Sequence, residues 1–181
     1  MQQQASNLLT TLTTALPDFA RRHTHDVAAF PAVADYLWPK SEKNDPFQTG
    51  LCTCFAAALR RWSCGRLSIL LVSTVSTAKG HVYHALGLLA QGSGEVVVLD
   101  SKGEMTLKQY ISAEQREVGA LQMVPTSAWL RLCHHSEEEE DKREFDSFVA
   151  HLADAMDREI GDGAQLFAGL PPQPVDATKL F

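Results

Sequence analysis

The sequence predicts an α+β domain in which one buried helix packs on a small antiparallel sheet, with further helices on either side. Three observations lead to this class. An apolar, alanine-rich helical segment follows Gly50, three strand-like segments follow that helix, and helical patterns occupy both ends of the chain. The 181 residues are 45% hydrophobic and 21% charged, which is the balance of a globular domain that can bury a core.

The first third of the chain is predicted to be helical. Leucines at positions 8, 9, 12 and 16 recur at helical spacing and predict a helix that ends at Pro17. A second helix is expected between Asp26 and Leu37, with Pro31 as an alternative first turn. Residues 38–46 form a polar loop with two prolines.

The central helix is predicted to begin just after Gly50 and to end at Gly65. Its apolar residues fall on one helical face. They are Cys52, Phe55, Ala56, Leu59 and Trp62. Three consecutive alanines at 56–58 allow close packing, so we expect this helix to be deeply buried.

Three strands are predicted after this helix. Residues 67–75 are β-branched and apolar, and residues 81–90 and 95–100 form a hairpin around a Gly-Ser-Gly turn. The remainder is predicted to be mainly helical, with short helices at 106–112 and 127–133 and an amphipathic helix at about 143–160.

Charge and composition exclude several classes of function. The 22 acidic residues exceed the 16 basic ones, so the net charge of −6 disfavours binding to nucleic acid and to acidic lipid surfaces. The most apolar run, 67–75, is too short to span a membrane. Four cysteines and no secretory signal indicate a cytoplasmic protein, with secretion by a route that needs no signal peptide left open.

Cys52 is the predicted nucleophile, because a cysteine at a helix N-terminus lies where partial positive charge favours the thiolate. The preceding Gly50 allows the tight turn that exposes it. His84, on a predicted strand, is the expected base, and Asp100, at the end of the paired strand, is the expected partner that orients the base.

These segments resemble the transglutaminase-like, papain-fold superfamily of cysteine hydrolases. Residues 50–61 resemble its nucleophile helix, His84-Ala85 resembles its histidine strand, and residues 96–100 resemble its closing strand, which ends in Asp. The resemblance covers residues 48–103 and implies a papain/transglutaminase-like fold. Since the sequence has no internal repeat and no domain linker, we expect a single papain-like catalytic domain over 1–168, followed by a Pro-rich tail over 169–181. It also implies acyl transfer through a thioester, as in a peptidase, deamidase or transglutaminase, with no cofactor and no metal.

Several alternatives stay open at this point. Leu86 stands where the family has an aromatic residue, and Cys54 is an alternative nucleophile because Gln48 precedes it by six residues, as in papain-type enzymes. Gln48 is a candidate oxyanion donor with either cysteine. His81 is an alternative base, since it and His84 are expected on opposite faces of one strand.

The class of function also has alternatives. The first expectation is a hydrolase or deamidase that acts on a protein or peptide, such as a bacterial effector or toxin, and a transglutaminase-type acyltransferase is its variant. The second is a non-enzymatic adaptor or chaperone that binds a protein partner through its acidic helices. The third is a zinc site built from Cys52, Cys54, His81 and His84, or a weaker one at residues 133–135.

Overall fold

A computed structural model describes residues 2–37, 45–76, 80–90, 96–113, 118–125 and 127–170. The helices are α1 (Gln2–His23), η1 (Thr24–Ala29), α2 (Pro31–Leu37), α3 (Pro46–Thr49), α4 (Cys52–Trp62), α5 (Leu107–Ala113), η2 (Leu130–Cys133), α6 (Glu139–Glu159) and α7 (Gly163–Leu166). The strands are β1 (Ser68–Ser76), β2 (Gly80–Ala90), β3 (Val96–Asp100), β4 (Gly103–Thr106) and β5 (Val118–Met123).

The five strands form one antiparallel sheet in the order β4-β3-β2-β1-β5. The β1–β2 hairpin is long, and its register runs from Ser68 opposite Leu88 to Ser76 opposite Gly80. The β2–β3 ladder is shorter and runs from Ala90 to Gly87 on β2. Since β3 ends at Asp100, it does not reach alongside the earlier half of β2, and this open stretch of the β2 edge is where the site forms.

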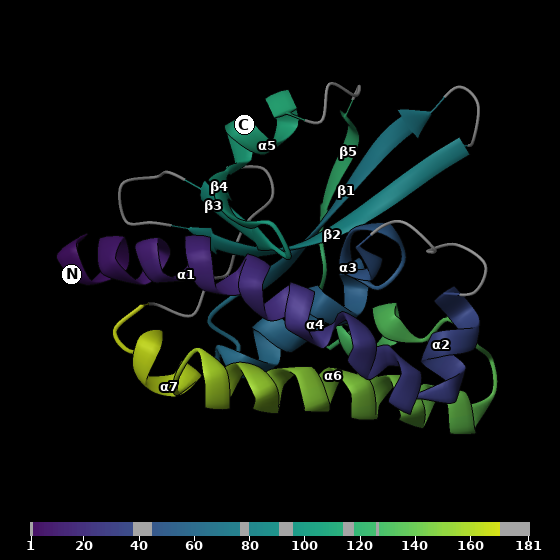
Figure 1. Ribbon diagram of the computed structural model, residues 1–181. Helices are drawn as coiled ribbons and strands as arrows, with labels where there is room; N and C mark the ends of the chain where they lie inside the picture. The colour runs from purple at the N-terminus through teal and green to yellow at the C-terminus, as the bar shows by residue number, and fades with distance from the viewer. Residues whose placement is uncertain are drawn as a thin grey trace.

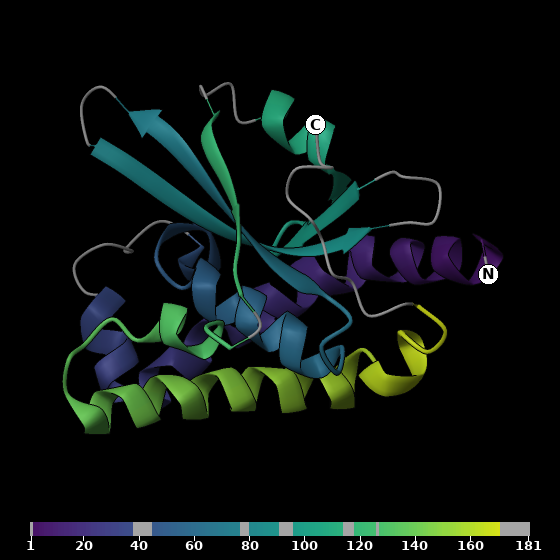
Figure 2. The same ribbon diagram turned by 180° about the vertical axis from the view of Figure 1, so that it is seen from behind.

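Helices cover both faces of the sheet (Figure 1). Helix α4 lies between the sheet and the long helix α6, and α1 crosses the same side (Figures 1 and 2). Eight of the eleven residues of α4 are buried. Helix α5 covers the opposite face, where Leu107 and Tyr110 pack with Leu86 and Val98 in a second, smaller core.

The predicted mixed α+β class with a small antiparallel sheet is confirmed, but the strand count was too low. Strands β4 and β5 lie at the two edges of the sheet, in the part of the chain predicted to be mainly helical. β4 has only four residues, and β5 reads Val-Gly-Ala-Leu-Gln-Met, with one β-branched residue. Neither has the β-branched run that marks a strand in sequence, and pairing with β3 and β1 decides their conformation.

The prediction that the first helix ends at Pro17 is wrong, because α1 continues through it to His23. A proline inside a helix leaves the carbonyl four residues earlier without its usual donor. Here that carbonyl belongs to Thr13, and the backbone of Gly103 packs directly against it. Burial of Phe19 and Ala20 beyond the proline favours continuation of the helix.

The other predicted elements are present with shifted ends. The segment 26–37 divides into η1 and α2, with Pro31 as the first residue of α2. Residues 130–133 form a 3-10 turn, and the last long helix begins at Glu139, within the run of five acidic residues at 137–141. The predicted tail lies outside the described residues from 171 onward. Within the described ranges, no helix combines the length and apolar character needed to cross a membrane.

Replacing Gly103 with Ala is expected to destabilise the fold, because Gly103 has φ of +107° and an added Cβ would lie 2.8 Å from the Thr13 carbonyl oxygen. We expect a loss of about 2 kcal/mol or more in the free energy of unfolding, measured by urea denaturation. Gly169→Ala is the matched control, since Gly169 has φ of +82° but nothing within 4 Å of its added Cβ. Equal losses for the two variants would contradict the packing argument.

Candidate active site

The site lies where the first turn of α4 meets the open edge of β2. Helix α3 prepares this position: the Asp45 carboxylate accepts from the Phe47 amide, and the Leu51 amide donates to the Pro46 carbonyl at 2.8 Å. Helix α4 then begins at Cys52. Gly50 has φ of −179°, an extended conformation that any residue can adopt. A glycine is needed here for close packing, because an added Cβ would lie 2.9 Å from the Leu37 side chain.

His84 and Asp100 come from the neighbouring strands β2 and β3. Continuing the β2–β3 register places Asp100 opposite Leu86, so His84 is its diagonal neighbour on the same face. Nε2 of His84 lies 3.4 Å from Oδ2 of Asp100. Both side chains are largely enclosed, with 14% of His84 and 4% of Asp100 exposed.

The structure brings Cys52 to the same histidine. The Cys52 thiol is hydrogen bonded to the imidazole of His84, and the backbone amides of Ala85 and Thr53 also bond to the sulfur. Ala85 follows His84 on β2, beyond the end of the β2–β3 ladder. The three predicted residues, Cys52, His84 and Asp100, therefore form one connected row.

The environment of this row favours the charged forms of all three groups. Burial raises the pKa of the Cys52 thiol, but the hydrogen bond and charge of His84 and the two backbone amides lower it to below the usual value. Burial lowers the pKa of His84, but Asp100 and Cys52 together raise it to about 9. Both shifts favour the charged forms, a thiolate on Cys52 and an imidazolium on His84.

Asp100 is held by three donors of its own. Burial raises the pKa of its carboxyl group, but His84, the Gln48 amide and the backbone amide of Lys102 hold it below its usual value. Nε2 of Gln48 lies 3.0 Å from Oδ2 of Asp100, and the Lys102 amide lies 2.7 Å from Oδ1. These contacts fix the Asp100 carboxylate beside His84.

Gln48 has a different contact from the one predicted. The sequence suggests an oxyanion donor, whereas the structure directs its amide nitrogen to Asp100 and, at 2.6 Å, to Ser101 Oγ. Ser101 in turn donates to Asp45, the residue that caps α3. An amide NH₂ group has two hydrogens, and these contacts use both. Gln48 is a positioning residue for Asp100 in this structure.

Three residues of the site were missed in the sequence. Asp45 and Ser101 complete the chain of hydrogen bonds behind Asp100, and Tyr110 of α5 lies parallel to the His84 ring at 6.1 Å between centroids. Ser101 directly follows a predicted catalytic residue, which was an available clue. Tyr110 gave none, because its contact depends on how α5 crosses the second face of the sheet.

The alternative nucleophile Cys54 lies elsewhere. Its side chain is completely buried and is hydrogen bonded to Cys133, and this bond together with burial raises the pKa of Cys133 well above the usual value. The two cysteines of α4 therefore point to different surroundings, as expected for residues two apart on a helix. The side chain of the alternative base His81 lies outside the described part of the chain.

The expected zinc ligands do not come together in the parts of the chain that are described. Cys54 bonds to Cys133, whereas Cys52 bonds to His84. At residues 133–135, His134 contacts Asp146 at 2.8 Å and His135 contacts Thr53 at 3.2 Å. One other cluster has the donors of a metal site, formed by His23, Asp26 and His151, and the sequence analysis assigned it no role.

No protein-family model, curated protein or solved structure matches this chain.

Alkylation by iodoacetamide is expected to modify Cys52 rapidly well below pH 8.5, the ordinary range of a thiol pKa. Mass spectrometry after labelling between about pH 5 and 9 measures this, with the exposed Cys64 as a reference in the same chain. In His84→Ala, the Cys52 rate at pH 6.5 should fall about tenfold or more. A Cys52 profile that matches Cys64 would contradict an activated thiolate.

Gln48→Ala is expected to shift the Cys52 labelling profile to higher pH. Without the Gln48 donor, Asp100 is held less firmly and stabilises the imidazolium of His84 less, so the thiolate loses part of its support. Thr49→Ala, an exposed neighbour on the same short helix, is the control. An unchanged profile in Gln48→Ala would refute the positioning role.

Proposed function

We propose that this protein is a cysteine-dependent acyl-transfer enzyme that acts on an amide bond through Cys52, His84 and Asp100. The observation that carries the proposal is the Cys52 thiol at the start of a buried helix, hydrogen bonded to an imidazole that itself contacts a buried carboxylate. Nucleophile, base and orienting acid are the three roles that this chemistry needs.

The reaction would proceed in two steps. The Cys52 sulfur attacks the amide carbonyl carbon, a C–S bond forms, and the C–N bond breaks as His84 transfers its proton to the departing nitrogen. The thioester is then attacked by water or by an amine, from which His84 takes a proton as the C–S bond breaks. Asp100 holds the imidazole in orientation and stabilises its charged form.

The oxyanion of each step would be stabilised by backbone amides. Cys52 is the first residue of α4, a position where the backbone N–H has no acceptor within the helix. This N–H is the donor that we assign. Gln48 is not assigned as an oxyanion donor, because its two amide hydrogens are donated to Asp100 and Ser101.

A papain/transglutaminase-like fold is the finer architecture that we propose. Its supports are the chain order of nucleophile helix, histidine strand and aspartate strand, and the antiparallel adjacency of β2 and β3. A protein or peptide amide is the proposed substrate class, with hydrolysis, deamidation and transamidation as outcomes set by the leaving group and the acceptor. A role as an effector or toxin that modifies one protein is consistent with this chemistry.

The test is whether Cys52 forms an acyl-enzyme that turns over. With p-nitrophenyl acetate, we expect a burst of p-nitrophenol, a steady phase, and an acetyl group located on Cys52 by mass spectrometry. A glutamine-rich peptide library then distinguishes ammonia release from peptide cleavage. Loss of Cys52 is expected to lower the steady rate by about 10³-fold or more.

Matched variants separate the possible outcomes. Cys54→Ala should retain the burst and the steady phase, because Cys54 faces Cys133 and not His84. His84→Ala should slow both phases. Steady turnover that survives in Cys52→Ala would refute the proposal, and acylation of Cys52 without His84-dependent turnover would favour a binding module that keeps the fold.

A further inference from the structure

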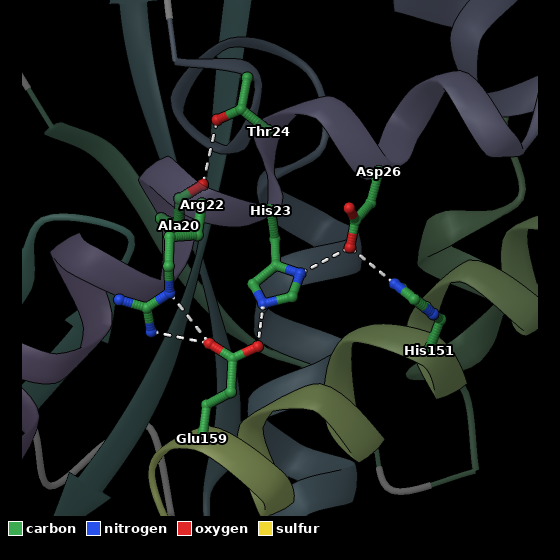
Figure 3. Close-up of polar contacts among 7 residues, drawn as sticks. All are labelled: Ala20, Arg22, His23, Thr24, Asp26, His151 and Glu159. Carbon is green, nitrogen blue, oxygen red and sulfur yellow. Dashed lines mark hydrogen bonds and ion pairs between the residues drawn. The ribbon is translucent and has the colours of Figure 1, made fainter.

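The cluster that joins the end of α1 to α6 contains two histidines around one carboxylate (Figure 3). Nδ1 of His23 and Nε2 of His151 lie 2.5 Å and 2.7 Å from the same oxygen, Oδ2 of Asp26. The three residues come from α1, α6 and the intervening 3-10 helix η1. We propose that these three residues form a divalent transition-metal site that binds Zn²⁺, separate from the catalytic row.

The donor set suits this ion. Zn²⁺ binds imidazole nitrogen and carboxylate oxygen at about 2.0–2.2 Å, and two histidines with one carboxylate leave a fourth tetrahedral position for water. The three donor atoms lie within 4.8 Å of one another. In a tetrahedral zinc site they would be about 3.3 Å apart. The two nitrogen–oxygen pairs, at 2.5 and 2.7 Å, would each have to open by less than about 1 Å, and the two nitrogens, which lie within 4.8 Å of one another, would have to settle at the same spacing. His151 is 39% exposed and is free of tight enclosure, so it can make that adjustment.

The second side of His23 gives an independent reason. Its Nε2 lies 2.7 Å from Oε1 of Glu159 (Figure 3). The Arg22 side chain donates two hydrogen bonds to the other oxygen of Glu159, at 2.7 and 3.0 Å. A histidine that binds a metal through one nitrogen commonly donates its other N–H to a carboxylate. His23, Glu159 and Arg22 have this second-layer arrangement.

The contacts on both ring nitrogens of His23 make the same point. A neutral imidazole has one N–H and one lone pair, yet both ring nitrogens of His23 face carboxylate oxygens. With Zn²⁺ on Nδ1, the neutral ring satisfies both sides, because its lone pair binds the ion and its Nε2–H donates to Glu159.

The ring of His23 is also held in place before any ion binds. It is 11% exposed and stacks on the buried ring of Phe19 at 4.2 Å between centroids. Zinc here would tie the C-terminal end of α1 to α6, and so stabilise the packing of both helices around the core.

Zinc binding is tested on the metal-stripped full chain with Zn²⁺ and Co²⁺ alone. The experiment uses the Cys52→Ala background, because the catalytic thiolate can itself bind zinc. We expect one Zn²⁺ per chain, a Co²⁺ absorption spectrum of tetrahedral type, and a melting temperature that rises with zinc concentration. His151→Ala should weaken binding at least about tenfold, and Glu159→Gln about 10- to 100-fold.

His25→Ala is the matched control, an exposed histidine in the same segment that should bind zinc as before. Should His151→Ala fail to fold, nitrogen NMR of the histidine rings gives the second readout: zinc should shift Nδ1 of His23 and Nε2 of His151. No binding, or binding that His151→Ala and Glu159→Gln leave unchanged, would overturn the proposal and leave a charged hydrogen-bond network. Zinc that binds the unsubstituted chain but not the Cys52→Ala chain would also overturn it, because the ion would then belong to the catalytic row.

Discussion

Helix α4 is enclosed by the sheet on one side and by α6 on the other, and the rest of the architecture follows from that enclosure. Its alanines at 56–58 are fully or almost fully buried, and the absence of larger side chains lets the helix approach the strands closely. Gly87 of β2 faces Leu59 of α4 at a distance that leaves little room for a side chain. An element packed this tightly has a fixed position, and so does its first residue, Cys52.

A thiol at a fixed position can act as a nucleophile only if its thiolate form is stabilised, and burial disfavours that form. Burial disfavours the charged form of each group in the row of Cys52, His84 and Asp100, and the neighbours offset this cost: His84 for Cys52, and Asp100 for His84. The row extends outward through Gln48 and Ser101 to Asp45, which caps the short helix before α4. The same hydrogen bonds that orient Asp100 therefore also anchor the turn that presents Cys52.

The row of Cys52, His84 and Asp100 and the cluster of His23, Asp26 and His151 lie in different parts of the fold and depend on different elements. The row joins α4 to the sheet, whereas the cluster joins α1 to α6. Both place histidine between carboxylates or beside a thiol, in surroundings that exclude much of the water. In the row, His84 can transfer a proton. In the cluster, His23 is held in one orientation by Glu159, which is itself bound by Arg22.

The sequence by itself determined the mixed class, the buried central helix, the first three strands and the identity of Cys52, His84 and Asp100 as residues to examine together. Hydrophobic periodicity and the Gly-x-Cys turn involve residues that are close in sequence, so they can be recognised without knowledge of the fold. What only the tertiary structure decided is which side chains meet. The edge strands β4 and β5 exist because of their partners, α1 passes Pro17 because Phe19 and Ala20 beyond it are buried, and Gln48 turns to Asp100 because Ser101 and Asp45 lie beside it. Residues 23, 26, 151 and 159 meet for the same reason: contacts between residues more than a hundred positions apart leave no periodic trace in the chain.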